Sequence, residues 1–173
     1  MKTMLPLLLC WVLSAGCAKP AETALAPLVK DEINAEKLWQ RITVESPYER
    51  YAFLPGHEEL RPGQAPHGKY HEVYVNSVYR QALPIKERVA PEGSIVVKKN
   101  FNAEKKHTNF TIMAKVRGFD PENGDWFWAM YEAGGKVRGS GKMKGCLDCH
   151  SGVKDNDFLV IRRLDQPVEA ARK

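Results

Sequence analysis

The sequence predicts one α+β domain, mainly an antiparallel β-sheet with a few helices packed on it. Four segments are rich in β-branched and aromatic residues and have Gly, Pro, Asn or Asp within two residues of their ends, as strands do: 69–76, 94–101, 109–119 and 125–132. One segment, 31–42, has the apolar spacing of a longer amphipathic helix. A chain of 173 residues, of which 27% are charged, is long enough for one core.

The first 16 residues, MKTMLPLLLCWVLSAG, predict an export signal. Its apolar run is well short of the roughly 20 residues that cross a bilayer as a helix. Cys17 stands where a bacterial lipoprotein carries its lipid, although Ser14 occupies the place at which such signals usually have leucine. A lipid on Cys17 and cleavage near Ala18 into a soluble form both remain open. Either predicts a domain in the periplasm or on the outer face of a bacterial membrane, with a lipid anchor as the only membrane contact.

Residues 17–29 are rich in Ala and Pro without a usable period, which predicts a flexible tether ahead of a domain over 30–173. The net charge of +5 falls to +4 without the signal, which holds one lysine and no acid. The densest basic pairs are Lys98 with Lys99 and Lys105 with Lys106. A mild and scattered excess of this kind predicts a solvated surface and no nucleic-acid partner.

The elements follow in order along the domain. Helix 31–42 has Ala35, Leu38, Trp39 and Ile42 at positions i, i+3, i+4 and i+7. Residues 54–69 are interrupted by Pro and Gly and predict a loop. After the strand over 69–76, residues 76–83 predict a short helix that Pro84 stops.

The strand over 109–119 alternates between two faces. Phe110, Ile112, Ala114 and Val116 share an apolar face, and Thr111, Met113, Lys115 and Arg117 share a polar one. Segment 125–132 is apolar on both faces and therefore belongs in the interior of the sheet. Residues 134–145 predict a Gly- and Lys-rich loop, and a phosphate-loop interpretation fails because Met143 stands where Ser or Thr should bind magnesium.

Residues 145–152, GCLDCHSG, place two of the chain's four cysteines and a histidine within five positions. Cys146, Cys149 and His150 have the C-x-x-C-H spacing of covalent haem c attachment. Two thiols at this spacing add to the two vinyl groups of one haem edge, and the adjacent imidazole then lies under the iron. The motif predicts one covalent haem c, attached through Cys146 and Cys149, with His150 as its axial ligand.

Other interpretations of the two cysteines are weaker. A thioredoxin-like pair belongs in a βαβ context, and a structural zinc site needs a fourth ligand that no further cysteine of the domain supplies. Cys10 leaves with the export signal, so no disulfide framework is available. Export also agrees with haem c, which is installed outside the cytoplasm.

The haem motif and three further segments resemble the cytochrome P-460 family and its sister, cytochrome c′-β. The four segments run in the order of the family and span roughly residues 45–165: PHGKYHEVYVN (66–76), PEGSIVVKKNF (91–101), GFDPENGDWFWAMY (118–131) and GCLDCHSG (145–152). The resemblance implies a sheet with helices, usually a homodimer, that encloses a five-coordinate haem iron.

In the P-460 branch, which oxidises hydroxylamine, a lysine of the G-x-[IV]-x-V-K strand is joined covalently to the haem. Lys98 matches that place in GSIVVK. Alternation sends Lys98 and Lys99 to opposite faces, so only one of them can reach the haem. A pocket lysine without a crosslink, as in cytochrome c′-β, and a solvated strand lysine remain the alternatives for Lys98.

The sequence departs from the P-460 branch on the distal side of the haem, opposite the axial histidine. Those enzymes carry a distal glutamate on the strand before the G-[DN]-W turn, but residues 107–119 contain no acid. Counting back from that turn puts Phe110 or a neighbour there, which predicts an apolar cap like that of cytochrome c′-β. Such a cap favours a neutral ligand such as nitric oxide and leaves a hydroxylamine oxidase without its base.

A sixth ligand from within the chain would instead make an electron-transfer cytochrome. Met113 is the candidate, although a strand methionine more often packs than ligates. His57, His67, His71 and His107 are predicted to be loop or surface groups. Hydroxylamine or nitrogen-oxide turnover, nitric oxide binding and electron transfer to a redox partner protein all remain open.

Overall fold

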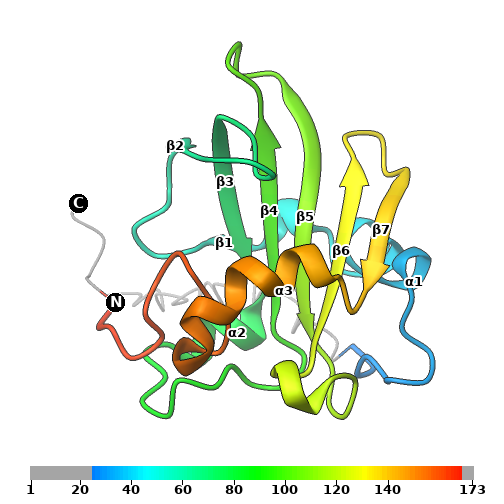
Figure 1. The fold of residues 1–173 in the computed structure, drawn as a ribbon, viewed down its shortest axis with the longest axis vertical. Helices are drawn as coiled ribbons and strands as arrows, with labels where there is room; N and C mark the ends of the chain where they lie inside the picture. The colour runs from blue at the N-terminus through cyan, green and yellow to red at the C-terminus, as the bar shows by residue number, and fades with distance from the viewer. Residues whose placement is uncertain (1–24, 169–173) are drawn as a thin grey trace, which may run out of the picture.

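A computed structural model describes residues 25–168, which form an antiparallel sheet of seven strands with helices on both faces (Figure 1). The strand order is β1-β3-β4-β5-β6-β7, and β2 also pairs with β3. The predicted α+β class is confirmed. The predictions for the export signal and for Cys17 lie outside the described residues. Across residues 25–168, no helix has both the length and the apolar character needed to cross a membrane.

The strands and helices have the following bounds. The strands are β1 Ala52–Phe53, β2 Arg61–Pro62, β3 Tyr70–Val75, β4 Ile95–Phe101, β5 His107–Lys115, β6 Trp126–Glu132 and β7 Val137–Gly141. The α-helices are α1 Ala35–Gln40, α2 Ser77–Ala82 and α3 Lys144–His150. A π-helical turn, Arg41–Glu45, continues α1, and 3-10 turns cover Tyr48–Arg50, Pro121–Asn123 and Ser151–Asn156.

The four predicted strands and both predicted helices are present, but the segment predicted as a Gly- and Lys-rich loop contains β7. Residues 137–141, VRGSG, have little strand propensity of their own. They become a strand because they pair with the edge of β6, where Ala129 lies opposite Ser140. Strand β7 therefore forms because it pairs with β6, and not because of the strand propensity of its own residues.

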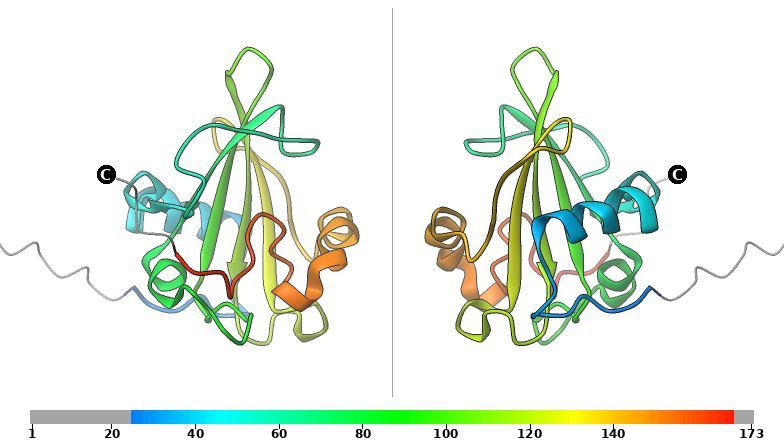
Figure 2. Two further views of the ribbon diagram at one scale, coloured as in Figure 1. Left: turned by 90° about the vertical axis from the view of Figure 1, so that its left-hand side faces the viewer. Right: turned by 90° about the vertical axis from the view of Figure 1, so that its right-hand side faces the viewer.

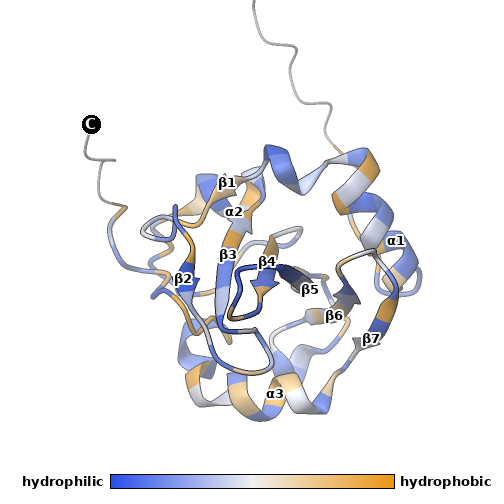
Figure 3. Cartoon of the chain, turned by 90° about the horizontal axis from the view of Figure 1, so that it is seen from above, coloured by the Kyte–Doolittle hydropathy of each residue, from blue (hydrophilic) through white to orange (hydrophobic). Residues whose placement is uncertain are grey.

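Helix α1 covers one face of the sheet, and Figure 3 looks along the strands at this arrangement. Asn34 caps the helix by accepting a hydrogen bond from the Lys37 amide at 2.8 Å. Leu38 and Ile42 are fully buried against the sheet, and the Tyr131 hydroxyl donates to the Ala35 carbonyl at 2.7 Å. These contacts fix the helix to β6.

The predicted tether over 17–29 joins the domain earlier than expected. Leu28 is buried in the core beneath α1, and the Arg41 guanidinium donates to the Ala26 carbonyl at 2.8 Å. Ala26 and Leu28 therefore contact the folded domain, whereas Leu25 and Val29 are exposed.

Helix α3 and the segment that follows it cover the other face of the sheet (Figure 2). This face includes Met113 and Lys115 of β5, which are each only 7% exposed. The face that Thr111, Met113 and Lys115 share is therefore covered although its side chains are mostly polar, because α3 and residues 157–164 lie over it.

Lys115 is buried by forming an ion pair with Asp157, which follows the 3-10 turn after α3. Its ammonium lies 2.6 and 2.8 Å from the two carboxylate oxygens, and Asp157 also accepts the Ala90 amide at 2.8 Å. The Trp126 indole donates to the Asp157 carbonyl at 2.9 Å. The loop around Asp157 is thereby attached to β5 and β6.

Replacement of Asp157 by Ala is expected to reduce the free energy of unfolding by about 3–5 kcal/mol, because it leaves the Lys115 ammonium buried without a counter-ion. Urea denaturation of the holoprotein measures the loss. Glu92→Ala is the matched control, since its pair with Arg117 is largely exposed and contributes less than about 1 kcal/mol. Equal losses for both variants would contradict the assigned role of the buried pair.

Candidate functional site

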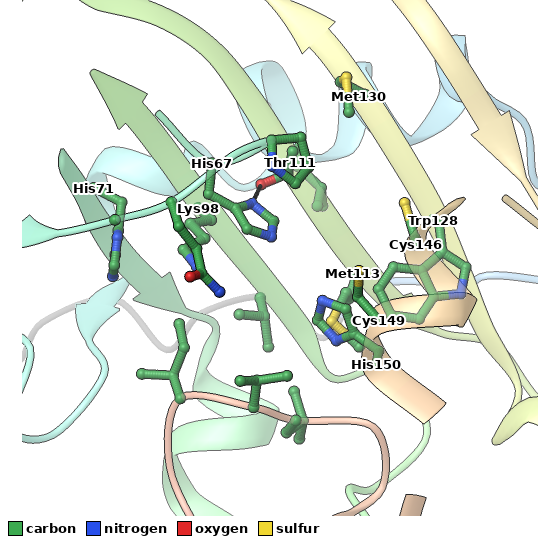
Figure 4. A pocket seen from close by; sticks show the side chains of 18 of the residues that line it. His67, His71, Lys98, Thr111, Met113, Trp128, Met130, Cys146, Cys149 and His150 are labelled. Atoms are coloured by element: carbon green, nitrogen blue, oxygen red, sulfur yellow. Dashed lines mark hydrogen bonds between the residues drawn. The ribbon is translucent and has the colours of Figure 1, made fainter. Parts of the chain in front are cut away.

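A cavity of about 440 Å³ lies between the sheet and α3 (Figure 4). Strands β4, β5 and β6 form its floor, the loop between β2 and β3 closes one side, and residues 159–162 close another. Most of the lining is apolar, and histidines, a lysine and an arginine enter it from several elements. A concave apolar site with few polar groups is typical of cofactor binding.

Both cysteines of the C-x-x-C-H motif line this cavity from α3. Cys146 and Cys149 are free thiols three residues apart, so they lie on one face of the helix. Cys146 is partly buried and Cys149 is exposed, and burial raises the pKa of the Cys146 thiol. Two unpaired thiols thus face a space into which a planar ligand can enter.

His150 projects into the same cavity from the end of α3, and its ring is held in place from two sides. Its Nδ1 is 2.6 Å from the carbonyl oxygen of Phe158. A carbonyl only accepts, so Nδ1 carries the proton and Nε2 keeps its lone pair. The Trp128 ring packs edge-on at 4.7 Å between ring centres. Ligating histidines have this arrangement, in which the second nitrogen donates to a carbonyl.

Lys98, Thr111 and His67 gather on the side of the cavity opposite His150. Lys98 and Thr111 are register partners on β4 and β5, and the Thr111 hydroxyl lies 2.8 Å from Nδ1 of His67. Burial lowers the pKa of Lys98 to about 8. Burial, and then the nearby Lys98, lower the pKa of His67 to about 3, so its imidazole is neutral at neutral pH.

Lys98 lines the cavity and Lys99 does not, as alternation predicts. Lys99 has Phe110 as its register partner on β5, and its ammonium lies over the Phe101 ring at 5.5 Å from the ring centre. Lys98 is therefore the lysine that can reach a ligand in the cavity.

His67 and His71 were predicted to be loop or surface groups, but both line the cavity. His71 is 6% exposed, neither ring nitrogen has a hydrogen-bond partner, and burial lowers its pKa to about 4. The position of His71 in β3 could have indicated its burial, because it alternates in phase with the buried Val73 and Val75. His67 lies in a loop, where no periodicity identifies its direction.

His57 and His107 lie at other positions. His57 stacks on His71 at 6.5 Å between ring centres and is absent from the cavity lining. His107 packs against Phe110 at 4.4 Å, on the opposite face of the sheet.

Phe110 does not shape the cavity, so the prediction that it forms the distal side is corrected. Its ring is buried under α1, where it packs against Trp39 at 5.5 Å and Tyr48 at 5.3 Å. The neighbouring Thr111 faces the cavity in its place. The expected apolar cap is therefore replaced by the polar group of Thr111 and His67.

Met113 lines the cavity two residues beyond Thr111. Its register partner is Trp128, the residue that packs on His150. Met113 thus lies in the row of side chains beside the predicted axial histidine rather than with His67, as Figure 4 shows.

The residues of the cavity fit a haem. The thiols and His150 have the required spacing on one helix, and the Nε2 atom of His150 is free to ligate. Arg162 adds a positive charge, and its buried Nε has no hydrogen-bond partner. A haem carries two propionate carboxylates, whose charge an arginine of this kind can balance.

The fold and the site together define a c-type haem protein in which an antiparallel sheet lies against a helix that carries the attachment motif. The model of the cytochrome P460 family matches residues 46–161, and the chain belongs to this family. No curated protein matches the chain.

Replacement of both Cys146 and Cys149 by Ala is expected to yield protein without covalent haem, because no other described residue of the cavity offers a thiol. Each single replacement is expected to keep the haem attached through the remaining sulfur. Extraction with acidified acetone followed by mass spectrometry measures the attachment. Covalent haem that persists in the double variant would contradict these assignments.

Proposed function

We propose that this protein is a mono-haem c-type cytochrome that binds a small neutral nitrogen ligand, nitric oxide above all, on the Lys98 side of its haem. The bound group supplies an iron that takes such ligands. Cys146 and Cys149 would hold the haem, and Nε2 of His150 would ligate its iron. Thr111, His67 and Lys98 surround the opposite side.

The observation that carries this proposal is the absence of a carboxylate from the described residues of the cavity lining. Oxidation of hydroxylamine releases protons, which a carboxylate near the iron is suited to accept. Here the nearest bases are His67 and Lys98. Burial lowers the pKa of His67 to about 3, which makes it a weak base, and a pKa of about 8 leaves Lys98 mostly protonated at neutral pH and so unable to accept a proton in most molecules. Binding of a neutral ligand needs no such group.

Hydroxylamine oxidation remains the alternative on the enzymatic side, and the position of Lys98 favours it. Lys98 points into the cavity, and its lowered pKa leaves part of its amine unprotonated and nucleophilic near neutral pH. A covalent bond between Lys98 and the haem would place the protein with the P-460 enzymes.

A second candidate function is electron transfer through a six-coordinate haem to a redox partner protein. One observation favours it, the separation of 6.3 Å between the ring centres of His67 and His150. We further propose, from the leader and from the resemblance, that the protein acts in the periplasm or on the outer face of a bacterial membrane, as a homodimer.

Nitric oxide is expected to change the absorption spectrum of the reduced holoprotein, whereas added hydroxylamine is expected to give no steady turnover with an electron acceptor. The proteolytic haem peptide should carry residues around Cys146 and no segment containing Lys98. A Soret band shifted far to the red, together with a Lys98 peptide retained on the haem, would overturn the binder in favour of the enzyme. An absorption spectrum that nitric oxide does not change would leave electron transfer as the remaining candidate function.

A further inference from the structure

His67 and His150 enter the cavity from opposite sides, and their rings point toward one another (Figure 4). In each ring the hydrogen bond engages Nδ1: His67 with the Thr111 hydroxyl at 2.8 Å and His150 with the Phe158 carbonyl at 2.6 Å. Each Nε2 is therefore left for another partner. Two neutral imidazoles with free Nε2 atoms that face each other are arranged as a pair of metal ligands.

The separation between the rings decides what fits between them. A metal–imidazole bond of about 2 Å, plus about 1.1 Å from that nitrogen to the ring centre, puts two axial imidazoles about 6.2 Å apart, centre to centre. The observed distance is 6.3 Å, with the rings at 73° to each other. A ligand on the iron with a hydrogen bond to His67 would need roughly 9 Å. The observed distance fits direct ligation by both rings.

His67 is held at this distance by the sheet. The Thr111 hydroxyl, which contacts Nδ1 of His67, also accepts a hydrogen bond from the side-chain amide of Asn100 at 3.2 Å. The loop is closed by the His67 amide, which donates to the Gln64 carbonyl at 2.8 Å, and the Lys69 amide donates to the Phe101 carbonyl at the same distance. The distal ring is thus attached to β4 and β5.

We propose that His67 is the second axial ligand of the haem iron, opposite His150, and that an incoming ligand must displace it. In this arrangement Nδ1–H of His67 donates to Thr111, just as Nδ1–H of His150 donates to Phe158. Thr111 is then a positioning residue. Met113 and Lys98 are the competing ligands from the same cavity. Displacement of His67 rests on the proposed function, whereas ligation in the absence of added ligand does not.

The test is electron paramagnetic resonance and absorption spectroscopy of the ferric holoprotein. The wild type is expected to be low-spin, and His67→Ala is expected to be high-spin, with the low-spin spectrum restored by added imidazole. His71→Ala and Met113→Leu are matched controls in the same cavity and should stay low-spin. Thr111→Val should keep the ligand but alter the low-spin signal, because the Nδ1 partner is lost.

A high-spin wild type would overturn the proposal. A low-spin spectrum that survives His67→Ala but is lost in Met113→Leu or Lys98→Met would overturn it in favour of that other ligand. If His67→Ala fails to retain haem, His67→Met decides the question, since a sulfur ligand must change the spectrum if residue 67 ligates the iron and leave it unchanged if it does not.

Nitric oxide binding separates this inference from the proposed function. If His67 leaves the iron in less than a tenth of the molecules, His67→Ala should bind nitric oxide at least about tenfold more tightly than wild type. If neither protein binds it, the proposed binding function fails while the spin states still decide the role of His67. If wild type and His67→Ala bind nitric oxide equally tightly and the wild type is high-spin, nitric oxide binding is supported and His67 is not an axial ligand.

Discussion

The hydrogen bond from Nδ1 of His150 to the Phe158 carbonyl is the contact on which the arrangement of the site depends. Asp157 and Phe158 both have positive φ values, 53° and 64°, which are unfavourable for residues other than glycine. The Lys115 ammonium and the Trp126 indole hold this loop by contacts to Asp157. The interior of the sheet therefore determines which way His150, the predicted axial histidine, faces.

The two sides of the cavity are built differently. On the His150 side, a short helix carries the thiols and the imidazole together, so their spacing is fixed within one element. On the opposite side, Thr111 and Lys98 come from adjacent strands, and His67 comes from a loop attached to both. The first side suits attachment of a cofactor. The second suits control of what reaches it, because a loop can move at smaller cost than a strand.

In the two proposals above, ligand binding and axial ligation by His67 would compete for the same position. A ligand that binds by displacing His67 loses affinity in proportion to the fraction of molecules in which His67 is bound. The same ligation would favour electron transfer, since an iron held by two fixed imidazoles undergoes little rearrangement between its oxidation states. The two candidate functions, ligand binding and electron transfer, would therefore use one site and would differ in the strength of the bond between His67 and the iron.

The main strands and helix α1 followed from the sequence, and the C-x-x-C-H spacing predicted the haem attachment set of Cys146, Cys149 and His150, because alternation, helical spacing and motif spacing are local properties. The choice between Phe110 and Thr111 was not local, since an error of one residue in a strand exchanges its two faces. The burial of Met113 and Lys115 depended on the cover that α3 and residues 157–164 provide. Only the tertiary structure brought His67 to face His150, because a loop has no regular alternation from which the direction of a side chain can be predicted.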